Sequence, residues 1–263
     1  MNPTQTSVPS GTRRAASVLG KFAFLRPGDW LTKHARVLVC MLVVILVQPG
    51  DYAWTAVASI AFSVVGFLYA FGLNYYLERD LDELVGKNRV RDLGTRTAAF
   101  LFVGLSAALF AIPAAMGNLA ATLVALYYWI MATMYSWRPI FLKARGLLSV
   151  ASQAVWLEVT HFLFFVCLTG YRNPWGVACL SAWLVLAVAK GATIHQIIGL
   201  DNDAKLGLRT LAVAYGRDRA IKIVGGMTWS LYVYSLVPFA VFPFPVALLL
   251  ALAIVFSNAK YRR

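Results

Sequence analysis

The sequence has little charge, few acidic residues and almost no cysteine. Charged residues make up 13% of its 263 residues, and only 11 are Asp or Glu against 24 Lys or Arg. Hydrophobic residues reach 60%. This balance excludes an ordinary soluble domain and is typical of a helical protein that crosses the membrane several times.

The three cysteines exclude a disulfide framework and a cysteine-based metal site. Cys40, Cys167 and Cys179 all lie in apolar runs without metal-ligand spacing, so we expect small packing residues. The first 20 residues lack a signal-peptide pattern and are expected to be disordered. Residues 21–263 are expected to form a single transmembrane domain in the lipid bilayer.

Apolar runs separated by short turns predict the membrane spans. Eight runs are expected to be helices, at residues 37–47, 53–73, 97–115, 119–135, 147–168, 175–198, 223–241 and 246–256. Only Arg172 falls in a turn on the side opposite the other basic loops, and Lys190 lies within a span. The loops at 74–96, 138–145 and 199–222 and both termini are therefore predicted to be cytoplasmic. The net charge of +13 is explained by this asymmetry, so no nucleic-acid partner is expected.

A first charged block follows the second apolar run. Asn74, Glu78 and Asp82 are spaced at i, i+4 and i+8, which places them on one face of a helix. Carboxylate and amide oxygens are the ligands that Mg²⁺ prefers, and Mg²⁺ often shares its coordination shell with phosphate oxygens of a substrate. The alternative is a solvated loop of mixed charge between two spans.

A second acidic block, with Asp201 and Asp203, closes the sixth apolar run. Basic side chains flank both blocks: Lys87, Arg89 and Arg91 follow the first, and Lys205 and Arg209 follow the second. Two such clusters predict a bipartite site that holds a diphosphate between metal-bound carboxylates and cations. The alternative is a pair of positive loops that carry a few balancing acids.

Ionisable residues inside the predicted spans are a third feature. Glu158 and His161 share one helical face at i and i+3, and such groups are costly within a membrane. They either orient or deprotonate an acceptor, or form a structural hydrogen bond between helices. Lys190 is placed to reach the diphosphate, to pair with Glu158 or to extend to the interface. His195 is expected to make a helix-end contact, and His34 to lie at the interface.

These motifs resemble, in order and spacing, those of the UbiA superfamily of intramembrane prenyltransferases. The first family signature reads Asn-Asp-x-x-Asp-x-x-x-Asp, and the second reads Asp-x-x-x-Asp followed by Gly-x-(Lys/Arg)-Thr-Leu. A loop between them reads Tyr-Ser-x-x-Pro-x-x-Leu-Lys-x-Arg-Gly. The matching positions are Asn74, Tyr75, Glu78 and Asp82, then Tyr135, Ser136, Pro139, Leu142, Lys143, Arg145 and Gly146, and last Gly199, Asp201, Asp203 and the run at 207–211.

The resemblance implies an all-α, polytopic transmembrane helical bundle of about eight to nine spans around a central cavity, with cytoplasmic helical loops. The implied enzyme uses Mg²⁺ to ionise an isoprenyl diphosphate and transfers the prenyl group to an aromatic or other small or lipid acceptor. Three alternatives remain open: a terpene cyclase on the same fold, a polyprenyl-phosphate sugar-phosphate transferase, and a non-catalytic lipid-binding relative.

The resemblance also assigns roles to residues. The catalytic set is Asn74, Glu78, Asp82, Asp201 and Asp203, of which the four carboxylates would be metal ligands. The diphosphate-binding set is Lys87, Arg89, Arg91, Lys143, Arg145, Lys190, Lys205 and Arg209, and the acceptor or cavity set is Glu158, His161 and Tyr135. Tyr75, Glu78 and Gly199 depart from the family pattern, in which all three positions are aspartate or another acid, so this chain offers fewer carboxylates.

Overall fold

The computed structural model of the chain describes residues 30–88, 90 and 93–259, with side chains from residue 34 onward. The segment 1–20 and the residues Arg89 and Arg91 lie outside this part of the chain. The helices are α2 (Trp30–Val47), α3 (Ala53–Leu77), α4 (Arg79–Leu84), α5 (Thr95–Ala115), α6 (Leu119–Ser136), η3 (Leu142–Ala144), α7 (Leu147–Trp156), α8 (Val159–Thr169), α9 (Pro174–Lys205), α10 (Leu211–Tyr215), α11 (Arg217–Tyr234), α12 (Pro238–Val241) and α13 (Phe244–Ala259). The two strands are β1 (Arg145–Gly146) and β2 (Arg209–Thr210).

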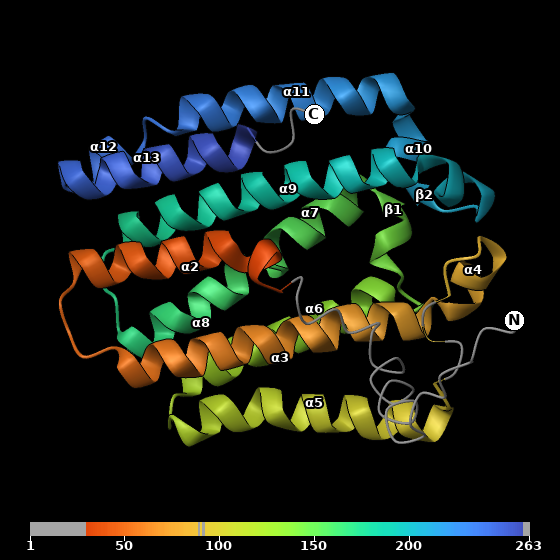
Figure 1. Cartoon of the computed structure of the whole chain (residues 1–263), viewed down its shortest axis with the longest axis horizontal. Helices are drawn as coiled ribbons and strands as arrows, with labels where there is room; N and C mark the ends of the chain where they lie inside the picture. Colours follow the sequence, from red (N-terminus) through yellow and green to blue (C-terminus); the bar gives the residue numbers. More distant parts are fainter. Residues whose placement is uncertain (1–29, 89, 91–92, 260–263) are drawn as a thin grey trace, which may run out of the picture.

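Long apolar helices confirm a helical, membrane-embedded architecture (Figure 1). Six stretches of the described residues are long and apolar enough to cross a membrane: Ala53–Leu77, Thr95–Ala115, Leu119–Ser136, Leu147–Thr169, Pro174–Lys205 and Arg217–Val241. Two further apolar helices, His34–Val47 and Phe244–Ala259, are shorter. The chain is thus an integral membrane protein, while the span count of eight to nine stays a prediction.

Two predicted helices differ from the expected ones near the motifs. The run at 147–168 is divided into α7 and α8, which meet at Leu157 and Glu158. Helix α9 extends to Lys205, so Asp201 and Asp203 lie in its last turns and not in a loop after it. A left-handed residue, Gly207 with φ of 68°, follows the helix end. The helix ends just before this glycine, because glycine readily adopts the left-handed conformation that terminates a helix.

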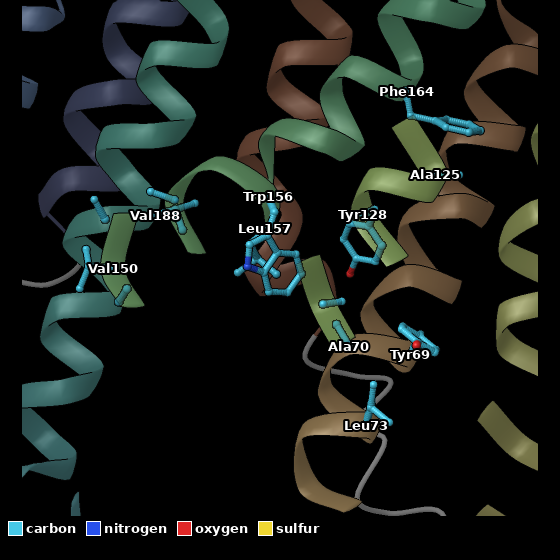
Figure 2. Close-up of a cluster of buried hydrophobic side chains, with 14 of the residues drawn as sticks. Tyr69, Ala70, Leu73, Ala125, Tyr128, Val150, Trp156, Leu157, Phe164 and Val188 are labelled. Carbon is cyan, nitrogen blue, oxygen red and sulfur yellow. The ribbon is translucent and has the colours of Figure 1, made fainter. Parts of the chain in front are cut away.

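Aromatic side chains pack the centre of the bundle (Figure 2). The rings of Phe62 and Phe164 stack with centroids 3.9 Å apart, which joins α3 to α8. Tyr128 of α6 lies edge-on to Trp156 of α7 at 5.3 Å. Buried aromatics of this size contribute most of the packing energy of a core, so these contacts hold α3, α6, α7 and α8 in a fixed arrangement. All three cysteines are free, as expected.

The motif-bearing segments gather at one end of the bundle. Strands β1 and β2 pair in parallel, with Arg145 opposite Arg209 and Gly146 opposite Thr210. Gly146 has a φ of 53°, a left-handed conformation that favours glycine. Figure 1 shows α4, β1, β2 and α10 at this same end. The loops expected on one side therefore do lie together, and their cytoplasmic location stays a prediction.

Candidate active site

A cavity of about 410 Å³ lies among α2, α3, α7 and α9 and extends to the motif-bearing end. At that end its walls carry polar side chains from three different motifs: Asn74, Lys87, Lys143, Asp203 and Thr210. Farther along, the apolar side chains of Phe67, Ala70, Phe71, Leu157 and Val188 line it together with the polar side chains of His34, Arg36, Gln153 and Glu158. The residues of α9 that line the cavity run from Val188 to Asp203, about 22 Å along the helix. The cavity thus combines a polar end with an interior of apolar and polar walls.

The two acidic blocks approach each other here, but they do not contribute equally. Of the four carboxylates predicted as metal ligands, all of which are described, Asp203 is the one that lines the cavity. Asp201 has a side chain that is 80% exposed and lies 3.8 Å from Arg217 Nη2. In the described part of the chain, no three His, Cys, Asp or Glu side chains group so that they could hold a metal ion by themselves. The role of each carboxylate as a ligand stays a prediction.

Glu78 is held by a buried polar network. Its carboxylate is only 4% exposed, forms an ion pair with Lys143 and accepts a hydrogen bond from Asn74 Nδ2. Asn74 also donates to Ser136 Oγ at 2.8 Å, which ties α3 to the end of α6. Burial raises the pKa of Glu78, and Lys143 opposes this rise. Burial alone would lower the pKa of Lys143, but the Glu78 carboxylate outweighs it, so the pKa is raised and the ammonium stays charged.

The expected ladder of Asn74, Glu78 and Asp82 does not lie on one continuous helix. Helix α3 ends at Leu77, α4 begins at Arg79, and Glu78 forms the junction with φ and ψ of −99° and 4°. The backbone N–H of Asp82 still donates to Glu78 O at 2.8 Å. At this junction the Glu78 side chain pairs with Lys143, which offsets the cost of burying the carboxylate.

The predicted cations also separate into groups. Lys87 and Lys143 line the cavity, whereas Arg145, Lys205 and Arg209 are exposed and do not belong to its described lining. Arg145 Nε donates to Ile140 O at 2.7 Å. Lys190 is buried and donates to Asn258 O of α13 at 3.0 Å. The roles of all these residues in diphosphate binding, like those of Arg89 and Arg91, stay predictions.

The inner part of the cavity contains an ion pair that the sequence reasoning missed. Arg36 of α2 donates from Nε to Glu158 Oε2 at 2.9 Å and from Nη2 to Glu158 Oε1, and both residues line the cavity. The signal was a lone base near the start of one apolar run and a lone acid in another, since such charges in a membrane are usually paired. His161 Nδ1 lies 2.6 Å from Leu157 O. His34 is 1% exposed and lines the cavity, and its position at the membrane interface stays a prediction.

Aromatic side chains complete the lining. Tyr135 donates to Gln153 Oε1 at 3.5 Å, and its ring lies 5.9 Å from that of Trp156. Both rings line the cavity. Electron-rich ring faces attract cationic groups, so this lining is suited to stabilise a carbocation.

Comparison with known proteins gives the family. Residues 37–263 match the UbiA prenyltransferase family. The chain belongs to this family. The motif resemblance is therefore confirmed, and with it the interpretation that the chain is an enzyme of the UbiA prenyltransferase type. Two curated relatives are similar to parts of this UbiA chain, each at 27% identity.

One relative is the digeranylgeranylglyceryl phosphate synthase of Haloquadratum walsbyi, matched over 74% of this chain and 68% of its own length. The other is the 4-hydroxybenzoate octaprenyltransferase of Dechloromonas aromatica, matched over 60% of this chain and 57% of its own length. The first name gives a product, and the second gives an acceptor, 4-hydroxybenzoate. The two names therefore do not identify one acceptor for this chain.

Solved structures confirm the fold. A UbiA homolog from Archaeoglobus fulgidus bound to DMAPP and Mg²⁺ superposes with a TM-score of 0.75, at 20% identity, over 92% of this chain and 85% of that one. The same homolog bound to GPP and Mg²⁺ gives the same TM-score. The present chain thus shares the UbiA fold with a protein whose structures contain prenyl diphosphates and Mg²⁺.

Proposed function

We propose that the protein transfers a prenyl group from an isoprenyl diphosphate to a small or lipid acceptor inside the cavity. The observation that carries this proposal is one continuous cavity with Asp203, Lys143 and Lys87 at one end and apolar side chains in the walls beyond them. A diphosphate matches the polar end, and an isoprenyl chain matches the apolar side chains. The bound ligands of the Archaeoglobus fulgidus homolog are of the same class, which supports the proposal.

Each residue at the polar end of the cavity has its own task in the proposed reaction. Lys143 and Lys87 present ammonium groups to the diphosphate, and their charges favour its departure with the electron pair of the broken C–O bond. Asn74 donates to both Ser136 and Glu78, and Glu78 pairs with Lys143, so the ammonium is positioned before the donor arrives. The aromatic lining presents ring faces that would stabilise the allylic cation that remains.

The polar end of the cavity is also suited to a Mg²⁺ ion whose ligands come mainly from the phosphate oxygens of the substrate. Mg²⁺ is commonly bound through one or two carboxylates together with phosphate oxygens, and Asp203 supplies one such carboxylate at the polar end. When bound there, the ion would neutralise charge on the leaving diphosphate. Asp203 is therefore the residue that we propose as ligand, with Glu78 as counter-ion of Lys143.

A substitution at Gly199 tests directly whether Asp203 is the carboxylate that binds Mg²⁺. A Cβ on Gly199 would lie 3.7 Å from both carboxylate oxygens of Asp203 and meet nothing closer. A Gly199→Asp variant should add a second oxygen ligand beside Asp203 and lower the Mg²⁺ concentration for half-maximal diphosphate release about tenfold, which corresponds to about 1.4 kcal/mol. Titration of diphosphate release with Mg²⁺ measures this shift.

Gly191→Asp is the matched control for that variant. Gly191 lies on the same helix, also lines the cavity and has open space around it, but it is two turns farther in, about 12 Å from Gly199 by helix rise. It should give no gain in Mg²⁺ affinity. An equal shift in both variants would contradict the placement of the ion at Asp203.

The reaction itself can be tested with purified protein in lipid nanodiscs. With Mg²⁺, geranyl diphosphate and the neutral phenol 4-methylphenol, we expect release of diphosphate and formation of a geranylated phenol. Dimethylallyl and farnesyl diphosphate should be tried in parallel. A cyclised hydrocarbon formed without acceptor would indicate the terpene cyclase, and no diphosphate release from any donor would refute the proposal.

A further inference from the structure

The inner part of the cavity has polar features that donor binding leaves unexplained. The ion pair of Arg36 and Glu158 lines it, with side-chain exposures of 18% and 4%. Trp156 also lines it, is 3% exposed, and its indole Nε1–H has no hydrogen-bond partner among the described residues. An isoprenyl chain would leave that donor unsatisfied and would remove the ion pair further from water, and both effects are unfavourable.

The geometry points to a recognition site for the acceptor at this place. We propose that Arg36, Glu158 and Trp156 bind the hydroxyl group of a neutral acceptor, an alcohol or a phenol that is otherwise apolar. This inference rests on the proposed prenyl transfer and names the class of its second substrate. Neither curated relative identifies an acceptor for this chain, because one name gives a product and the other gives that relative's own acceptor.

A hydroxyl group matches the three side chains. A hydroxyl both donates and accepts hydrogen bonds, whereas a carboxylate only accepts and an indole N–H only donates. Glu158 provides the acceptor for the hydroxyl proton, and Trp156 Nε1 provides a donor to an acceptor oxygen. Figure 2 shows the Trp156 ring beside Tyr128, and the two ring centroids are 5.3 Å apart. The indole N–H is buried without a partner among the described residues, so an acceptor oxygen would satisfy it.

The charges of Arg36 and Glu158 favour an acceptor that carries no charge of its own. Arg36 faces Glu158 with two of its N–H groups, so the positive charge is offset within the pair. An acceptor that carried its own carboxylate would meet Glu158 as a like charge in a region of low dielectric, which is costly. The site therefore disfavours anionic acceptors and accepts neutral ones.

The apolar surroundings define the rest of the acceptor. Phe67, Leu157 and Val188 line the cavity around this polar site. A small aromatic ring or an alkyl chain would fill that space, whereas a sugar or a charged headgroup would lose its hydration without compensation. The acceptor class is thus a hydrophobic alcohol or phenol.

Two probes that differ in one group test the proposal. 4-Methylphenol and 4-hydroxybenzoate share a phenol ring, and only the second carries a carboxylate. In nanodiscs with Mg²⁺ and geranyl diphosphate, the wild-type protein should use 4-methylphenol with a kcat/KM at least about tenfold higher. 4-Methylanisole, which has no hydroxyl proton, should give no product above background.

Glu158→Gln should change the preference and not simply lower the rate. This variant keeps the side-chain size but removes the negative charge that faces Arg36, so the site becomes more positive. The ratio of kcat/KM for 4-methylphenol over 4-hydroxybenzoate should fall about tenfold or reverse, while binding of a labelled non-hydrolysable geranyl diphosphate analogue changes by less than about twofold. A purely structural role would lower both activities equally.

Trp156→Phe provides an independent variant that keeps the ion pair intact. It removes the indole N–H but keeps an aromatic ring at the cavity wall, so the KM for 4-methylphenol should rise about fivefold more than the KM for geranyl diphosphate. Trp54→Phe, at a position that is 79% exposed, is the matched control and should leave both constants unchanged. The thermal stabilisation of the protein by 4-methylphenol alone should fall in Trp156→Phe and persist in Trp54→Phe.

The outcomes separate this inference from the proposed function. Diphosphate release with equal use of both phenols, unchanged in Glu158→Gln, would overturn the acceptor site while prenyl transfer stands. If the Glu158 and Trp156 variants changed the preferred donor chain length and left the acceptor KM unaltered, this part of the cavity would belong to the prenyl tail, and the inference would be wrong. No turnover of any donor would refute the proposed function itself.

Discussion

Replacing Asp203 with asparagine is expected to lower the rate of diphosphate release on the order of 100- to 1,000-fold, the range seen when one preorganised electrostatic group is removed from an active site. Asp203 is the predicted carboxylate that lines the cavity, at the same end as Lys143 and Lys87. Asparagine keeps the shape but removes the negative charge that would bind the Mg²⁺ ion on the diphosphate. Steady-state release of diphosphate from geranyl diphosphate measures the effect.

Asp201→Asn is the control with the same chemistry two residues away. The Asp201 side chain is 80% exposed and faces Arg217 at 3.8 Å, so its loss should change the rate by less than about threefold, as for other surface ion pairs. Binding of the labelled donor analogue at varied Mg²⁺ should weaken in Asp203→Asn and not in Asp201→Asn. Equal losses in both variants would show that Asp201 also reaches the substrate.

The different positions of these two aspartates were predictable in principle. Residues at i and i+2 of a helix point about 200° apart, so they do not face the same cavity. The sequence analysis placed Asp201 and Asp203 after the end of the sixth span, where this rule does not apply. The structure continues α9 to Lys205, and the rule then separates them. The error came from the helix boundary, because acidic residues were taken as the end of a membrane span.

Other parts of the fold followed directly from the sequence. Apolar runs long enough to cross a bilayer must form helices, since each backbone group needs a hydrogen-bond partner inside the membrane. The basic loops were expected on one side, and the pairing of β1 with β2 brings two of them together. The family motifs likewise indicated that Asn74, Lys143 and Asp203 would meet at one site, and these three residues do line one cavity.

The sequence alone could not show which charged residues far apart in the chain form ion pairs. Glu78 and Lys143 are separated by 65 positions, and Arg36 and Glu158 by 122. Each pair depends on how helices pack side by side, which hydrophobic periodicity does not specify for helices that are apolar all round. Lys143 was therefore assigned only to the diphosphate and Glu78 only to the metal, although in the structure each is the other's counter-ion.

This pairing gives Lys143 two tasks, and a Lys143→Met variant should show both. Loss of one charged hydrogen-bond donor to the diphosphate should weaken donor binding about 10- to 100-fold, from about 1.5–3 kcal/mol per charged hydrogen bond. Glu78 would also be left buried without its cation, which should lower the thermal stability of the protein. Equilibrium binding of the labelled donor analogue and the melting temperature in detergent measure the two effects separately.

A double variant separates the two tasks. In Glu78→Gln/Lys143→Met no buried charge remains at this pair, so most of the lost thermal stability should return, because replacing both partners costs less than removing one. Donor affinity should stay as low as in Lys143→Met, since the ammonium is still absent. Lys205→Met, an exposed lysine that does not belong to the described cavity lining, should change neither quantity. Recovery of donor affinity in the double variant would mean that Lys143 serves only to neutralise Glu78, and the diphosphate site would then have to be assigned to Lys87 and Asp203.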